Sequence, residues 1–213
     1  MSEVEDWGGS GASGGGTGAY GGGTGRPLRD RLVDVGVELV AREGAQALTL
    51  REIARRAGVS HGAPRRYFPT HRELLSAIAR RGFDGLGARA AAAIGDGTAP
   101  PREQLAELAR VYLAFARDNR GMYELMFRHD VLESGRPGLR ETSLPLFGVL
   151  AALVARVRPD ADARLIAGAL WANLHGIAQL WLWGSLQLAT GAEDIAPLLR
   201  SALDAHLGPE ADR

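Results

Sequence analysis

From residue 27 onward, apolar residues recur at helical spacing, and this periodicity constrains the fold more than any other feature. Leu28, Leu32, Val35 and Leu39 follow one another at intervals of four, three and four residues. Such spacing places them on one face of a helix. Between turn signals, no run alternates apolar and polar residues with the period of two that a strand shows. The sequence therefore predicts an all-α fold.

Glycine, proline and capping residues divide this stretch into about nine helices. The expected ranges are 27–43, 50–57, 61–67, 70–93, 101–118, 121–132, 141–157, 161–190 and 193–207. The segment before them, residues 1–25, consists mostly of Gly, Ser, Thr and Ala. Such a segment buries too little apolar surface to offset its ordering entropy, so we expect a disordered tail.

Cysteine and histidine usage narrows the possible chemistry. The 213 residues include no cysteine and only five scattered histidines, so no metal site and no cofactor is expected. No nucleophile–base pair and no paired carboxylates stand at a supporting spacing, which argues against an enzyme. No secretory signal is visible either, and a cytoplasmic location is expected.

One segment is long enough to cross a bilayer. Residues 165–192 contain no charged side chain. However, Asn173, Gln179 and Gln187 interrupt the segment, and their amides are costly in hydrocarbon. We expect a buried helix of a soluble dimer and no membrane association, with a membrane span as the alternative.

Positive charge is concentrated near the N-terminus. Residues 26–81 contain 12 arginines and six acidic residues, whereas the formal charge of the whole chain is zero. A local excess of this kind is typical of a module that binds nucleic acid.

Within this basic segment, two short helices meet at a tight turn. Thr49 and Glu52 form a capping box at the start of the first helix, with each residue able to satisfy the backbone of the other. Gly58 gives the turn after this helix its backbone freedom, and Ser60 is expected to cap the helix of residues 61–67. Two helices joined in this way predict a helix-turn-helix, whose second helix enters the major groove of DNA.

The run LVDVGVELVAREGAQALTLREIARRAGVSHGAPRRYFPTHRELL, residues 32–75, resembles the tetracycline-repressor (TetR-type) family of transcriptional regulators. A second motif, Trp171-x-x-x-His175-Gly176, resembles the Trp-His-Gly signature of one subclass in that family. The chain departs from this subclass at Arg65, where an aromatic phosphate contact is usual. The resemblance implies a helix-turn-helix domain at 26–75 and an effector-binding and dimerisation domain at 76–210.

The resemblance also implies roles for individual residues toward double-stranded DNA. Arg51 is expected to reach a base edge, most simply guanine, and Ser60, His61, Gly62 and Ala63 to face the groove. The residues expected at phosphates are Thr49, Arg65, Tyr67 and His71. Arg55 and Arg56 fit a solvated face better, and Phe68 fits the core.

Aromatic and methionine residues cluster in the second half, where plain core packing and an effector pocket are both open interpretations. The candidate pocket residues are Tyr112, Phe115, Met122, Tyr123, Met126, Phe147, Trp171 and His175, and Phe127 falls among them in the sequence. Apolar walls with a few polar groups are typical of a small-molecule site.

The last two expected helices, 161–190 and 193–207, are expected to form a homodimer interface, because the helix of residues 161–190 carries apolar residues on more than one face. The resemblance then implies a repressor released from a palindromic operator by a small-molecule effector. The alternatives are an activator with the same DNA-binding head, or a helical ligand-binding module.

The helix of residues 70–93 links the two halves and contains Gly82, Gly85 and Gly87. Each glycine costs about 1 kcal/mol relative to alanine inside a helix. Two interpretations are open: a compliant hinge between the two domains, or close helix packing that requires small residues.

Overall fold

The computed structural model describes residues 27–132 and 139–209, and every regular element within these ranges is a helix. The helices are α1 (Leu28–Glu43), α2 (Leu50–Arg56), α3 (Ala63–Tyr67), α4 (His71–Ile94), α5 (Pro101–Asp118), α6 (Arg120–Met126), α7 (Leu139–Val157), α8 (Ala163–Leu182), α9 (Ser185–Thr190) and α10 (Ala196–Leu207), with a 3-10 turn η1 (Ala45–Ala47) after α1. The all-α prediction is confirmed. The predicted disordered tail, residues 1–25, lies outside the described residues.

The prediction of one helix over residues 161–190 is wrong. Gly184 adopts a left-handed conformation, with φ at 78°, and it separates α8 from α9. A left-handed glycine is a common helix end because it needs no Cβ. Nothing around Gly184 marks a break in the sequence, since apolar residues continue on both sides. The predicted helix 121–132 is also too long, because α6 ends at Met126.

The first three helices form a small unit around a shared core. Leu32 and Leu39 of α1, Ile53 of α2 and Phe68 after α3 are all buried. Arg31 of α1 donates a hydrogen bond to the carbonyl oxygen of Ala57, 2.9 Å away, in the turn that follows α2. This bond fixes the turn against α1.

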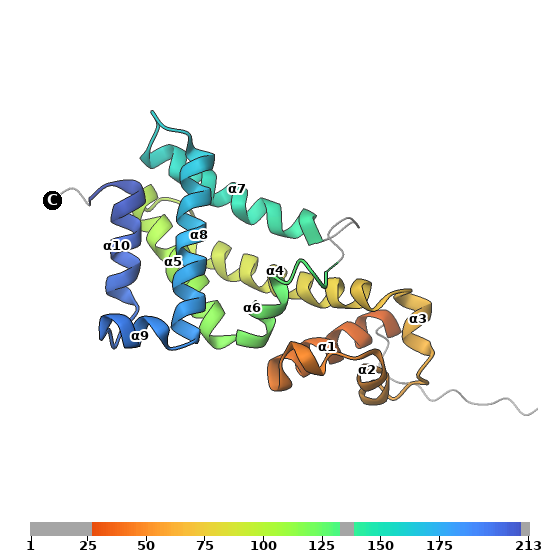
Figure 1. The fold of residues 1–213 in the computed structure, drawn as a ribbon. Coiled ribbons are helices and arrows are strands. Elements are labelled where there is room, and N and C mark those ends of the chain that lie inside the picture. The colour runs from red at the N-terminus through yellow and green to blue at the C-terminus, as the bar shows by residue number, and fades with distance from the viewer. Residues whose placement is uncertain (1–26, 133–138, 210–213) are drawn as a thin grey trace, which may run out of the picture.

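Helix α4 connects this unit to the rest of the chain. Thr70 caps its first turn by accepting a hydrogen bond from the Glu73 amide at 3.1 Å, and its 24 residues give it a length of roughly 36 Å. Figure 1 shows α1, α2 and α3 near one end of α4, with α8 and α10 beyond its other end. Along its length α4 packs against α1, α5, α6 and α7.

Two glycines of α4 have different surroundings. A Cβ on Gly82 would lie 2.6 Å from the Met126 sulfur and 2.8 Å from the Met122 side chain, whereas among the described residues a Cβ on Gly85 has no neighbour within 4 Å. Gly82 thus fits the close-packing interpretation. A hinge role of Gly85 remains a prediction.

We therefore expect opposite effects from two matched substitutions in α4. Gly82→Ala overpacks the contact with α6 and should lower the free energy of unfolding by about 1–3 kcal/mol. Gly85→Ala meets no such contact and should raise it by about 0.5–1 kcal/mol through helix propensity. Urea denaturation of both variants and the parent protein measures the two shifts. Equal effects of the two substitutions would contradict this account of the packing.

Candidate functional site

Helix α2 begins with half of the predicted capping box. The Thr49 hydroxyl accepts a hydrogen bond from the Glu52 amide at 3.2 Å. The other half is wrong, because the Thr49 amide donates to the Ala47 carbonyl oxygen. The Glu52 carboxylate instead accepts hydrogen bonds from Arg55 and Arg56. Two nearby guanidinium groups outcompete one backbone amide for this carboxylate.

These ion pairs separate the arginines of α2 into two kinds. The hydrogen bonds of Arg55 and then Arg56 lower the pKa of Glu52 to about 2, and Arg56 also pairs with Glu43 of α1. Arg51 is exposed, and no ion pair of its guanidinium is found among the described residues. Arg51 is therefore available to a ligand, whereas Arg55 and Arg56 are engaged within the protein.

The turn between α2 and α3 follows the expected geometry, but its capping does not. Gly58 has a φ of 66°, in the left-handed region that favours glycine. Helix α3 begins at Ala63, with Pro64 in its first turn and no side-chain cap. The prediction that Ser60 caps a helix starting at residue 61 is wrong: its backbone carbonyl accepts from the Ala63 amide at 2.9 Å. Gly62 and Pro64 delay the start of the helix.

The residues predicted to contact DNA lie on α2, the turn and α3, with one at the start of α4. All but one of them are exposed, and the exception, Ala63, is half-buried; the exposed ones are Thr49, Arg51, Ser60, His61, Gly62, Arg65, Tyr67 and His71. Exposed arginines and small polar side chains around the start of a short helix can contact both phosphates and base edges.

Two residues at the end of this unit also hold it together. His71 Nε2 donates a hydrogen bond to the Leu48 carbonyl oxygen at 2.6 Å, which connects α4 to the segment before α2. Phe68 is 2% exposed, as its predicted core position requires, and the guanidinium of Arg29 lies 5.0 Å from its ring centre. The His71 ring is thus partly committed within the chain.

In the second half, five of the eight candidate pocket residues gather around Phe127. Its ring centre lies 4.8 Å from that of His175, 5.2 Å from Tyr123 and 6.2 Å from Trp171. Tyr112 and Phe147 complete the group through edge contacts with Tyr123 and Trp171, respectively. The other three candidates lie elsewhere: Met122 and Met126 against Gly82, and Phe115 beneath the Arg89 guanidinium.

At the centre of this group, Tyr112, Tyr123 and His175 form a polar network. Both hydroxyl oxygens lie 2.8 Å from His175 Nδ1, and they are 3.3 Å from each other. Burial raises the pKa of Tyr112 to about 12 and also raises that of Tyr123, and it lowers the pKa of His175 below its ordinary value. The network therefore favours neutral groups, which suit an uncharged polar ligand atom.

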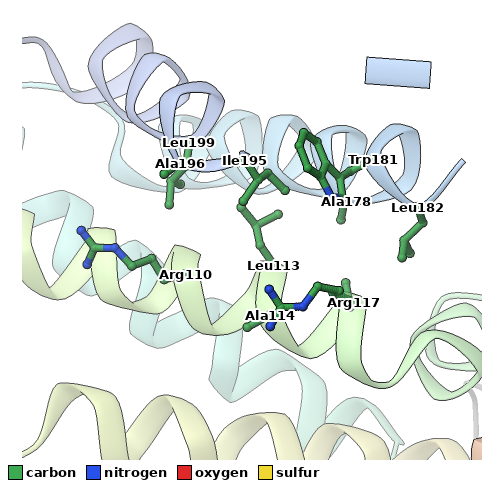
Figure 2. Close-up of a pocket in the computed structure, with 11 residues that line it drawn as sticks. Arg110, Leu113, Ala114, Arg117, Ala178, Trp181, Leu182, Ile195, Ala196 and Leu199 are labelled. Carbon is green, nitrogen blue, oxygen red and sulfur yellow. The ribbon is translucent and has the colours of Figure 1, made fainter. Parts of the chain in front are cut away.

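A cavity of this domain lies on a different side of α5 and contains none of the eight candidate pocket residues. Its volume is about 200 Å³, and it is bounded by α5, α8 and the start of α10. Figure 2 shows Leu113 of α5 directed toward Ile195, with Trp181 of α8 above. The sequence does not indicate this cavity, because its apolar wall residues come from three helices that are far apart in the chain. Only the seven-residue spacing of Arg110 and Arg117 marks the face in the sequence.

The lowered pKa of His175 predicts a pH dependence of stability. The unfolded chain binds a proton on this histidine near pH 6.5, and the folded chain does so only at lower pH. The contribution is therefore complete above pH 6.5 and is lost as the pH falls through the folded pKa. We expect the thermal midpoint to fall between pH 7.5 and 5.5, and to fall less in His175→Gln. The exposed control His61→Gln should retain the full decrease; an equal decrease in all three proteins would contradict the assignment.

Comparison with known proteins assigns both halves of the chain. Residues 32–78 match the family described as "Bacterial regulatory proteins, tetR family", and residues 105–206 match "Tetracyclin repressor-like, C-terminal domain". Together these ranges cover more than two thirds of the chain. Both descriptions concern regulators, so the expectation of a regulator rather than an enzyme is confirmed.

Individual relatives agree with this assignment. The HTH-type transcriptional regulator BetI of Rhizobium meliloti (strain 1021) is 39% identical over 83 residues, which are 39% of this chain and only 40% of that protein. A protein of unknown function from Rhodococcus sp. RHA1 is 26% identical, with a TM-score of 0.72 over 90% of this chain and 97% of that chain. The multidrug binding protein EbrR, solved with imidazole, is 27% identical, with a TM-score of 0.59 over 89% and 99% of the two chains. The chain therefore belongs to the tetR family of bacterial regulatory proteins.

Proposed function

We propose that this chain is a DNA-binding transcriptional regulator of the cytoplasm, acting as a homodimer on a palindromic operator. We further propose that it is a repressor, which a small-molecule effector releases from DNA. Residues 26–75 would bind DNA, and residues 76–210 would bind the effector and the second subunit. The exposed surface of α2 and α3, with Arg51 outside any described ion pair, is the observation that carries the proposal.

The contacts of α6 support a route from effector to DNA. At its start, a Cβ on Gly121 would lie 2.4 Å from the Val40 carbonyl oxygen of α1. Two residues later, the Tyr123 hydroxyl joins the His175 network. A ligand that displaces the Tyr123 ring acts on α6, and at Gly121 this helix has no free space against the Val40 carbonyl oxygen of α1. A resulting movement of α1 would change the distance between the two α3 helices of a dimer, which are the helices that enter the major groove.

The outer face of α8 supports the dimer. This helix has an apolar window long enough to cross a membrane, yet only 28% of that window is buried within the chain. Six exposed or half-exposed residues of α8 and its C-cap form a stripe at helical spacing: Leu165, Ala169, Ala172, Gly176, Leu180 and Trp183. Small residues at the middle of the stripe allow a second helix to approach closely. A symmetric partner helix covers such a stripe, and the interface would then be isologous.

The Trp171–His175–Gly176 motif supports placing the chain in the Trp-His-Gly subclass. His175 and Trp171 take part in the aromatic group around Phe127, with their ring centres 6.3 Å apart. Arg65 departs from that subclass. As an exposed arginine on α3 it can bind a phosphate through charge and paired hydrogen bonds.

DNA selection tests the regulator function and the role of Arg51. Purified protein should select an inverted repeat from random duplexes, and binding should weaken as salt rises because phosphate contacts release counterions. Arg51→Ala should lose roughly 10–100-fold in affinity for the selected site, with less loss on random DNA. Arg156→Ala, an exposed arginine of α7, is the matched control and should bind as the parent does. If no specific site is enriched, the proposed function fails.

Light scattering tests the dimer. Leu180→Glu places an unpaired carboxylate in the proposed interface and should raise the dimer dissociation constant at least about thirtyfold. Leu144→Glu changes an equally apolar, exposed residue of α7 (62% exposed) and should leave the dimer intact. A monomeric parent protein, or a dimer that survives Leu180→Glu, would rule out this interface.

A further inference from the structure

The cavity between α5, α8 and α10 has no role in the regulatory function proposed above. It shares no residue with the Tyr112–Tyr123–His175 network. Its walls are apolar, apart from two arginines of α5 at its edge (Figure 2). Its apolar walls include Leu113, Ala114, Ala178, Trp181, Ile195 and Leu199.

The volume of the cavity sets the size of its occupant. At about 200 Å³, it exceeds the roughly 150 Å³ of an engineered apolar cavity that stays dry and binds benzene. A single aromatic ring with a small alkyl group therefore fits. Aliphatic walls and the indole of Trp181 offer such a body dispersion contacts but almost no hydrogen bonds, so they favour an apolar body over a polar one.

The edge of the cavity sets the charge of its occupant. Arg110 and Arg117 stand two helical turns apart on α5, each in a surface ion pair, with Glu107 and Asp118 respectively. Both arginine side chains are about two-thirds exposed, at 60% and 66%. Exposed pairs of this kind contribute little to stability, so the guanidinium groups can turn to a ligand at small cost. A carboxylate accepts two parallel hydrogen bonds from one guanidinium group.

The cavity is also compatible with the proposed dimer. At 100° per residue, Ala178, Trp181 and Leu182 lie on the side of α8 opposite Gly176 and Leu180 of the exposed stripe. A partner helix on that stripe would therefore leave the cavity open along α5.

We propose that this cavity binds a small apolar carboxylate, with one aromatic ring between the three helices and its carboxylate at Arg110 or Arg117. Such a ligand joins α5, α8 and the start of α10. Its binding does not depend on DNA, so the proposal can fail or stand separately from the regulatory function.

Isothermal titration with 4-ethylbenzoate tests both parts of the site. The neutral 4-ethylbenzamide has the same shape and should bind at least about tenfold more weakly, because it lacks charge-assisted hydrogen bonds. The double variant Arg110→Gln/Arg117→Gln should lose the same factor for the carboxylate. Arg120→Gln, which removes an equally exposed arginine from its pair with Glu124, should change nothing. Equal binding of acid and amide, or no loss in the double variant, would overturn the proposal.

Two further variants locate the ligand in the cavity. Ala114→Leu fills the cavity and should abolish the heat of binding while the dimer persists. Retained binding would show that the proposal is wrong. Dissociation of the dimer would also contradict it, because it would mean that a side chain of the partner subunit occupies the cavity. With 4-bromobenzoate, bromine should quench the fluorescence of Trp181, and Trp181→Phe should remove that quenching. Quenching that persists unchanged in Trp181→Phe places the ligand elsewhere. Arg51→Ala should bind both carboxylates as the parent does, whatever its affinity for DNA.

Discussion

The contact between the start of α6 and the last turn of α1 governs how the two halves of this protein can move. Gly121 lies so close to the Val40 carbonyl oxygen that even a methyl group would not fit. On the far side of α6, Met122 and Met126 press against Gly82 of α4 in the same way. Since packed interiors respond to displacement by repacking rather than by compressing, a change at α6 must reach both α1 and α4. The unit of α1, α2 and α3 is thus coupled to the C-terminal helices through the contacts of α6 with α1 and α4.

This arrangement gives the glycines of α4 distinct physical meanings that their spacing in the sequence does not reveal. At Gly82, the Met126 sulfur occupies the space that a Cβ would need, whereas Gly85 faces open space among the described residues. Three glycines within six residues look like a hinge when only the helix itself is considered. Once the neighbouring helix is known, at least one of them is a packing residue that stiffens the junction.

The helices and the turn of the N-terminal half could be predicted because their sequence signals are local. Helical periodicity, the Thr49 cap and Gly58 depend on neighbours within a few residues, and the elements they predict are present. The two wrong predictions in this half also have local causes. The Glu52 carboxylate binds Arg55 and Arg56 instead of the backbone amide of Thr49. Pro64 has no amide hydrogen to donate to the Ser60 carbonyl oxygen, so α3 begins at Ala63. In the second half, the decisive contacts join residues far apart in the sequence: Tyr112 and Tyr123 lie 63 and 52 positions before His175. No periodicity encodes which aromatic residue meets which, or where a cavity remains.

The C-terminal half contains two chemically different environments for a ligand. The Tyr112–Tyr123–His175 network contains two hydroxyl groups against one imidazole nitrogen, and burial keeps all three neutral. A ligand there must exchange hydrogen bonds with neutral groups and displace a well-packed ring, which couples its binding to α6. The cavity beside α5 demands neither, because its walls are apolar and its arginines stand at the edge. A ligand in that cavity would therefore act on α10 and α8, next to the proposed dimer interface, and not directly on the junction with α1.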